Sequence, residues 1–287
     1  MAGFPTVDSV VNAWSVNRKG QKLFFNKVMP SVSVANTPHT LWTATGLPGA
    51  GAYGSVGKAN GRVCYGAQSG SFTAGAFRYQ NATSPATQHL ISLGGTSITS
   101  SGTGTLILVD RVSDCLLAHA ETTGSITGVT ATSRLESITT PGDGCQIWCE
   151  VQTGFSAASN TITFTYTNQL GTGSRTTQNM VTVASAIAGR SVNANLWQGL
   201  QAGDTGVRSI ESLTLVSGTA TGQYAVCLVR PLASIPMPAV AQYVERDFVV
   251  ELPNLEKIFD DSCLQLIYVP TAAVTATLFG EIRIASN

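Results

Sequence analysis

The stretch Thr161-Ile162-Thr163-Phe164-Thr165-Tyr166-Thr167 alternates strictly between apolar and threonine side chains. Successive side chains of a β-strand point to opposite faces of the sheet, so Ile162, Phe164 and Tyr166 share one face and the threonines share the other. A period of two is typical of a strand with one buried and one solvated face. The following Asn168-Gln169-Leu170-Gly171 has the composition of a turn. The stretch therefore predicts a half-buried β-strand.

Similar short runs occur on both sides of this strand. Residues 106–109 have the composition of a buried strand, which we expect to break after Asp110-Arg111. Residues 209–216 and 223–229 predict two further strands between glycines. Many short strands at fairly even spacing, with little helical periodicity, favour an all-β fold, either a β-sandwich or a jelly roll.

The C-terminal part follows three prolines at positions 231, 236 and 238. These residues predict a stiff crossing segment, after which residues 263–269 and 276–284 have the composition of final strands. We therefore expect a β-sandwich domain over residues 46–287. Within it, residues 233–287 are a candidate separate closing segment.

Residues 1–45 differ from the rest of the chain. A short apolar-periodic stretch ending at Trp14 allows one or two helical turns, and aromatic residues interleaved with Pro30 and Pro38 follow. We expect an extended N-terminal arm over residues 1–45 that packs on something outside the domain. Its candidate assembly contacts are the aromatic and basic side chains Trp14, Arg18, Lys19, Lys22, Phe24, Phe25, Lys27 and Trp42.

Charge is scarce and unevenly placed. Only 11% of the 287 residues are charged, against about 25% in average soluble domains. Residues 1–109 hold seven basic side chains and one acidic one, Asp8, while the net charge of the whole chain is zero. Opposite charges can pair within the fold, or the basic part of one copy can meet an acidic surface on a neighbour. The basic residues are too sparse to favour nucleic-acid binding.

Motifs of cofactor-binding and catalytic sites are incomplete. Residues 49–54 spell a dinucleotide-binding fingerprint, but no strand precedes them and no helix follows. Cys145 and Cys149 have no second pair at zinc spacing, and three scattered histidines define no triad. The carboxylates of Asp110, Asp143, Glu150 and Asp204 are candidates for a catalytic pair, although acidic residues in glycine-rich loops are more often turn formers. We expect no enzymatic activity, no metal and no cofactor.

The sequence also carries no targeting signal. The N-terminus lacks the basic and apolar regions of a secretory signal, and no apolar run reaches the ~18–20 residues of a membrane span. These features predict a protein made in the cytoplasm, without a membrane partner. In that compartment the six cysteines are expected to be buried free thiols.

Four segments together resemble a family of tailed-bacteriophage virion proteins. They are Leu41-Trp42-Thr43-Ala44-Thr45-Gly46-Leu47-Pro48-Gly49-Ala50-Gly51, Leu106-Ile107-Leu108-Val109-Asp110-Arg111, Thr163-Phe164-Thr165-Tyr166-Thr167-Asn168-Gln169 with Gly171, and Leu200-Gln201-Ala202-Gly203-Asp204-Thr205-Gly206-Val207-Arg208-Ser209-Ile210. Each is a strand with its turn, and together they span residues 41–232. The resemblance implies a capsid decoration or cement protein on the outer surface of the virion head, with the major capsid protein and neighbouring copies as partners.

Geometry favours a homotrimer, because a threefold platform touches several capsid subunits at once. Two alternatives remain open at this point. One is a tail or baseplate component. The other is a carbohydrate-binding module for host attachment, which would need exposed aromatic side chains from among Trp14, Trp42, Trp148 and Trp197.

Overall fold

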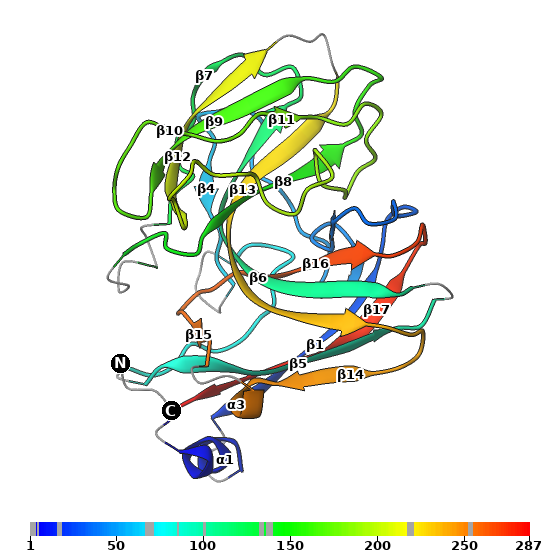
Figure 1. Ribbon diagram of the computed structural model, residues 1–287. Helices are drawn as coiled ribbons and strands as arrows, with labels where there is room; N and C mark the ends of the chain where they lie inside the picture. Colours follow the sequence, from blue (N-terminus) through cyan, green and yellow to red (C-terminus); the bar gives the residue numbers. More distant parts are fainter. Residues whose placement is uncertain are drawn as a thin grey trace.

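The protein has an all-β, sandwich-like architecture built from three antiparallel sheets (Figure 1). The computed structural model describes residues 4, 6–15, 19–66, 72–84, 86–99, 102–131, 135, 140–216, 221–251 and 255–287. We call the three sheets terminal, central and distal. No helix among these residues is long and apolar enough to cross a lipid bilayer.

The terminal sheet contains strands from both ends of the chain. Its order is β14 (Val244–Asp247), β5 (Gln88–Ser97), β17 (Thr277–Ser286), β1 (Gly20–Val28) and β3 (Thr45–Leu47), and β15 (Lys257–Ile258) also pairs with β5. Two short helices lie close to this sheet, α1 (Val7–Ser15) and α3 (Phe248–Glu251).

The central sheet has the order β2 (His39–Thr40), β16 (Leu264–Pro270), β6 (Gly104–Ala118), β13 (Gln223–Met237) and β8 (Gln146–Thr153), with β4 (Arg62–Val63) also paired to β6. The distal sheet has the order β10 (Arg175–Thr176), β9 (Thr161–Asn168), β12 (Val207–Val216) and β7 (Gly124–Ser125), with β11 (Met180–Val181) also paired to β9. In β9 the residues Ile162, Phe164 and Tyr166 are fully buried and the threonines are half-buried, which confirms the predicted alternation.

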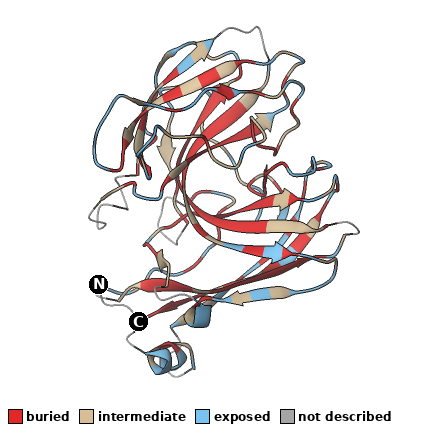
Figure 2. Ribbon diagram, in the orientation of Figure 1, coloured by how far each residue is buried: buried red, intermediate tan, exposed pale blue. Residues whose placement is uncertain are grey.

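Two long strands join the halves of the molecule. β6 and β13 have 15 residues each and pair with one another from end to end. In Figure 1 they curve from the lower half, where they lie over β5 and β17, into the upper half beside β8 and β9. The terminal and distal sheets therefore each form a sandwich with a different half of one bent central sheet. Buried residues follow these two strands through both halves (Figure 2).

Bulges keep both hydrophobic cores on one face of the central sheet. Leu106 and Leu108 pack in the core against the terminal sheet, whereas Cys115 and Leu117 pack in the core against the distal sheet. Leu108 and Cys115 are an odd number of residues apart and would point to opposite faces of a regular strand. The register shift between Leu228 and Val229 adds a residue to β6, which restores the common face.

The N-terminal part of the chain corrects the expectation of an extended arm. β1 pairs with β17 along its whole length and with β3 at residues 26–28, so it is an internal strand of the terminal sheet. Its burial alternates, and Leu23 and Phe25 lie in the core. The prolines that suggested an arm, Pro30 and Pro38, lie outside β1, which has an uninterrupted period of two.

The C-terminal part is not a separate closing segment either. β13 runs without interruption through Pro231 and Pro236, while β16 and β17 are interior strands of two different sheets. Pro231 is tolerated because the register shifts there, and β8 pairs with β13 only as far as Val229. Beyond that point the strand pairings among the described residues place no strand on that edge of β13, so a missing N–H there costs no ladder bond.

Candidate functional site

Three of the predicted assembly contacts are buried: Phe25, Lys27 and Trp42 are only 2%, 2% and 1% exposed. The Phe25 ring packs edge-on to Phe77 in the core, with 6.3 Å between ring centroids. Trp42 lies under the Arg111 guanidinium, 4.7 Å from the ring centroid. These three side chains hold the fold together and cannot reach a partner.

Lys27 has a specific structural role. Its ammonium donates hydrogen bonds to the carbonyl oxygens of Ala44 at 3.2 Å, Pro48 at 2.6 Å and Gly49 at 3.3 Å. Burial lowers its pKa to about 8. The lysine therefore fastens the turn after β3 to β1. The sequence contains a sign of this inward position. Lys27 follows the apolar Leu23 and Phe25 at a spacing of two, so on a regular strand it points to the same face as they do.

The remaining predicted contacts lie at the surface or close to it. Trp14 is half-buried and packs over Gly20, where an added Cβ would lie 2.0 Å from its ring. It thus fastens α1 to β1. The exposed Lys19 donates a hydrogen bond to the carbonyl oxygen of Asn287 at 2.8 Å. Arg18 lies outside the described residues.

Lys22 and Phe24 point to solvent from the outer face of the terminal sheet. The outward residues of β1 are Lys22, Phe24, Asn26 and Val28. Asn26 pairs with Leu47 of β3 on one side and with Phe279 of β17 on the other, so these two side chains share the same face. Phe24 and Leu47 are 57% and 56% exposed. Phe24, Val28, Leu47 and Phe279 form what we call the apolar strip.

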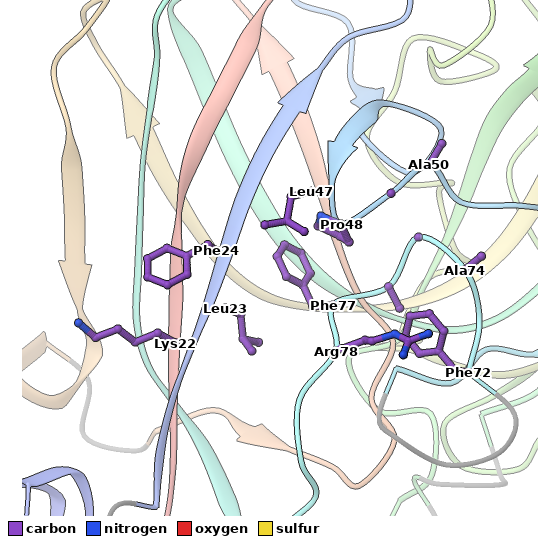
Figure 3. Close-up of a pocket in the computed structure, with 13 residues that line it drawn as sticks. Lys22, Leu23, Phe24, Leu47, Pro48, Ala50, Phe72, Ala74, Phe77 and Arg78 are labelled. Carbon is purple, nitrogen blue, oxygen red and sulfur yellow. The ribbon is translucent and has the colours of Figure 1, made fainter.

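A groove borders the apolar strip. It has a volume of about 450 Å³ and lies between β1, the turn after β3 and the segment 72–78 (Figure 3). Apolar side chains line most of it, and its only charged lining residues in the described part of the chain are Lys22 and Arg78. The Arg78 guanidinium stacks over the Phe72 ring at 4.1 Å from the centroid. The groove thus combines aromatic surface with positive charge.

Across the apolar strip, towards β14, the charges are already paired. Arg283 of β17 bridges to Glu245 of β14 at 3.1 Å and to Glu281 on its own strand. By contrast, no ion pair of Lys22 or Arg78 is found with any described residue. Lys22 and Arg78 thus give the groove lining positive charge that forms no ion pair with a described carboxylate.

A second polar cluster lies inside the protein, on the other face of the central sheet. Arg111 and Glu150 are fully buried and joined by an ion pair of 2.5 Å, and Asp114 bridges to Arg111 at 2.8 Å. The partly exposed Arg62 binds Asp114 from outside at 2.8 Å. Two guanidiniums and two carboxylates balance in charge. Burial opposes ionisation of Asp114, but Arg111 and then Arg62 outweigh it and hold its pKa below the usual range.

The Glu150 carboxylate is surrounded by hydrogen-bond donors, beginning with Arg111 Nη1. The carboxylate also accepts hydrogen bonds from Trp148 Nε1 at 2.6 Å, from the Tyr53 hydroxyl at 3.0 Å and from Gln265 Nε2 at 3.4 Å. Burial, followed by the neighbouring Glu150, raises the Tyr53 pKa well above its usual value. This arrangement stabilises a charge pair in the interior and leaves the carboxylate no free hydrogen-bonding position for a substrate.

The sequence reading misplaced two of the candidate carboxylates. Asp110 and Arg111 do not end a strand, because β6 continues to Ala118, and Glu150 lies within β8. Asp110 accepts hydrogen bonds from Ser262 Oγ at 2.8 Å and from the Cys263 amide at 2.9 Å. Charged residues enter these strands because partners from other strands meet them in the interior, which no local pattern reveals.

The other two carboxylates are turn residues, as expected of acids in glycine-rich loops. Asp204 binds Arg175 Nε at 2.9 Å, the Tyr166 hydroxyl at 2.6 Å and Asn168 Nδ2 at 2.8 Å. Its hydrogen bond with Arg175, together with those from Tyr166 and Asn168, lowers its pKa to about 2. Asp143 accepts a hydrogen bond from Thr205 at 2.7 Å. Each of the four carboxylates is therefore engaged by its own set of partners.

All six cysteines are buried and carry free thiols, in agreement with the prediction. Cys145 and Cys149 both belong to the core against the distal sheet. His119 is buried as well, stacked on Phe155 at 3.7 Å, and burial lowers its pKa. No group of three or more His, Cys, Asp or Glu side chains suited to hold a metal ion is found in the described ranges.

No protein-family model and no curated protein matches this chain. Among solved structures, it is similar at a very low level to the VP2 subviral particle of infectious bursal disease virus, with 11% identity and a TM-score of 0.18 over 93% of this chain and 80% of the other. A structure of the Gt strain of the same virus has 10% identity and a TM-score of 0.16 over the same shares. Similarity at this level defines neither a fold nor a function for this chain.

Proposed function

We propose that this protein is a non-enzymatic structural component of a tailed-bacteriophage particle that decorates the outer surface of the head. It binds the major capsid protein and neighbouring copies of itself, as a homotrimer, and ties capsomers together. The observation that carries the proposal is the outer face of the terminal sheet, where the apolar strip is exposed next to a groove with unmatched positive charge. Exposed apolar and aromatic groups of this kind mark protein-interaction surfaces.

The architecture supports a role in resisting mechanical force on the particle. The two sandwiches share β6 and β13, so the halves cannot move apart without breaking two continuous, paired 15-residue strands. The buried charges are neutralised within the chain. The resemblance of residues 41–232 to a phage virion family points the same way. None of these features requires a substrate.

The structure weakens one alternative. Of the four tryptophans that could stack on sugars, Trp42 and Trp148 are buried, and the half-buried Trp197 packs edge-on to Trp148 at 6.2 Å between centroids. Trp14 covers Gly20. Sugar-binding modules present exposed aromatic rings, and these four rings are engaged in the fold. A glycan array is the direct test of the carbohydrate-binding alternative.

The first experiment is the copy number of the protein in purified particles, relative to the major capsid protein, by quantitative mass spectrometry. Hundreds of copies are expected for a head-wide decoration protein. A few tens or fewer would instead favour a tail or baseplate component. Complete absence from particles would overturn the virion role.

A second experiment tests the surface. Phe24→Asp and Phe279→Asp place charge in the apolar strip and should weaken rebinding to heads stripped of the protein by about tenfold or more, as loss of interface aromatic residues does. Leu170→Asp is the matched control, because Leu170 is 72% exposed but lies on the distal half. Equal binding of all three variants would exclude the apolar strip as the contact surface.

A further inference from the structure

One edge of β1 is only partly paired. β17 pairs with β1 from Gly20 to Val28, but β3 covers the opposite edge only at residues 26–28. In an antiparallel ladder, alternate residues direct both their N–H and C=O groups to the same side. Alternate residues of the segment 20–25 therefore direct these groups away from β17, along an edge that spans about 20 Å at ~3.3 Å per residue.

This free edge faces the groove. Lys22, Leu23 and Phe24 line one side of the 450 Å³ space and residues 74–78 line another. In Figure 3 the Lys22 and Phe24 side chains extend away from Arg78, so Lys22 lies at the rim of the groove. Within the described ranges no backbone hydrogen bond joins residues 22–24 to residues 74–78. Farther along, Gln21 bridges to Gln80 through its side chain, with its amide donating to the Gln80 carbonyl at 2.8 Å. The two sides thus approach at one end and leave the groove beside β1.

The groove lies where a further strand would add to β1. Neighbouring strands lie ~4.8 Å apart, and unpaired strand edges are templates for a further strand. An added strand would continue the position that β3 occupies at residues 26–28. The edge of a second copy's sheet is a poorer occupant, because the segment 74–78 closes the far side where that sheet would have to extend.

The chemistry of the walls selects the side chains. Phe24 and Leu47 offer apolar surface, and Lys22 and Arg78 offer positive charge that no described carboxylate neutralises. Arg78 is pre-positioned by its stacking on Phe72. A complementary segment carries acidic side chains for the two cations and apolar side chains for the aromatic surface.

We propose that this groove binds one extended, acidic peptide segment of a partner protein, which adds to the free edge of β1 as a further strand. Main-chain hydrogen bonds along residues 22–25 supply the affinity, and Arg78, with Lys22 at the rim, supplies the preference for acidic side chains. The inference rests on the proposed assembly role in one respect, namely that the bound segment comes from a partner protein in the particle. Binding of a peptide to the groove is measured separately from the copy number in particles, so either can fail alone.

The experiment uses the full chain and two acetylated octapeptides, one alternating Val with Glu and one alternating Val with Lys. Binding is followed through the backbone amide signals of the isotope-labelled protein. The Val-Glu peptide should shift the amides of residues 22–25 and slow their hydrogen exchange. It should bind about tenfold more tightly than the Val-Lys peptide.

Charge variants test the source of this preference. Lys22→Glu and Arg78→Glu should each reduce the preference for the Val-Glu peptide about tenfold. Arg208→Glu, which makes the same change in net charge on the distal sheet, should leave it unchanged. An absence of binding, or a preference that survives both groove variants, would overturn the proposal.

N-methylated peptides test the strand geometry. In one Val-Glu peptide every odd-numbered backbone amide is methylated, and in a second peptide every even-numbered one, so that each peptide lacks donors on one edge of an added strand. One of the two methylated peptides should fail to bind, and the other should still bind. Equal affinity of the two methylated peptides would exclude strand addition and would indicate binding through side-chain contacts alone.

Discussion

Two regions of this protein combine aromatic rings with cations, and they differ in how the charge is balanced. In the interior, Arg111 lies over Trp42 and Tyr53 and is paired with Glu150. At the surface, Arg78 lies over Phe72 in a groove whose lining also includes Lys22 but no carboxylate. A buried cation must find compensating groups within the chain, a carboxylate for Arg111 or carbonyl oxygens for Lys27, because an uncompensated charge in the interior costs several kcal/mol. An exposed cation is balanced by solvent and remains available to a partner.

The same contrast separates two consecutive residues. Phe24 and Phe25 are chemically identical neighbours on β1, yet one lies on the outer face and the other in the core. One face of the N-terminal segment is therefore structural, and the other is available for binding. Four measurements test this division.

Deleting residues 1–28 should have the largest effect. It removes α1 and the whole of β1, which lies between β17 and β3, and leaves the edge of β17 and the core unprotected. We expect loss of the cooperative unfolding transition in circular dichroism. Deleting only residues 1–15 should keep that transition, because β1 remains. A folded protein lacking residues 1–28 would restore the idea of a separable arm.

Glu150→Ala should cost about 3–5 kcal/mol of the free energy of unfolding, because Arg111 would lose one of its two buried carboxylates and keep Asp114, which Arg62 shares. Urea denaturation measures this change. Glu251→Ala removes an exposed ion pair with Arg246 and should cost no more than about 1 kcal/mol. Equal costs for the two variants would show that solvent reaches the interior cluster.

Phe25→Ala should cost about 3–5 kcal/mol through the cavity that it leaves in the core. Phe24→Ala should change stability by no more than about 0.5 kcal/mol, since its ring is exposed. Thermal or urea unfolding of the two variants gives the difference directly. A large loss of stability in Phe24→Ala would mean that the outer face is covered within the protein itself.

Protonation of Asp204 should have the smallest effect, worth about 1 kcal/mol or less for a partly exposed pair. Its folded pKa of about 2 lies below the unfolded value near 3.8. The contribution is therefore fully present above the unfolded value and is lost as the pH falls towards 2. The difference in unfolding free energy between the wild type and Asp204→Asn should shrink between pH 5 and pH 2. A constant difference would exclude the carboxylate charge as its source.

The fold class follows from local patterns, but several elements do not. The alternation in residues 161–167 predicts β9 because its period of two reflects one buried face. The same reasoning fails at Asp110-Arg111 and at Pro231, where charged residues and a proline continue a strand. Partners from β8 and β16 satisfy the charges, and a bulge accommodates the proline. Such compensation comes from residues far away in the chain.

The candidate site could also be predicted only in part. Sequence reasoning found Lys22 and Phe24 because basic and aromatic side chains cluster there, but it could not separate them from Phe25, Lys27 and Trp42. Arg78 was not singled out, since it lies more than fifty residues from Lys22 in the chain. Its place in the groove depends on how the segment 72–78 packs beside β1.

The all-β class, the buried thiols and the uneven charge can be derived from the amino-acid sequence alone, because these properties depend on composition and on periods of a few residues. The tertiary structure was needed to establish that β1 is internal, that one bent sheet serves two cores and that a groove opens at the β1 edge. These features depend on strand pairing, which joins residues distant in sequence. β1 lies beside β17, from the opposite end of the chain, because their alternating apolar faces bury the same core.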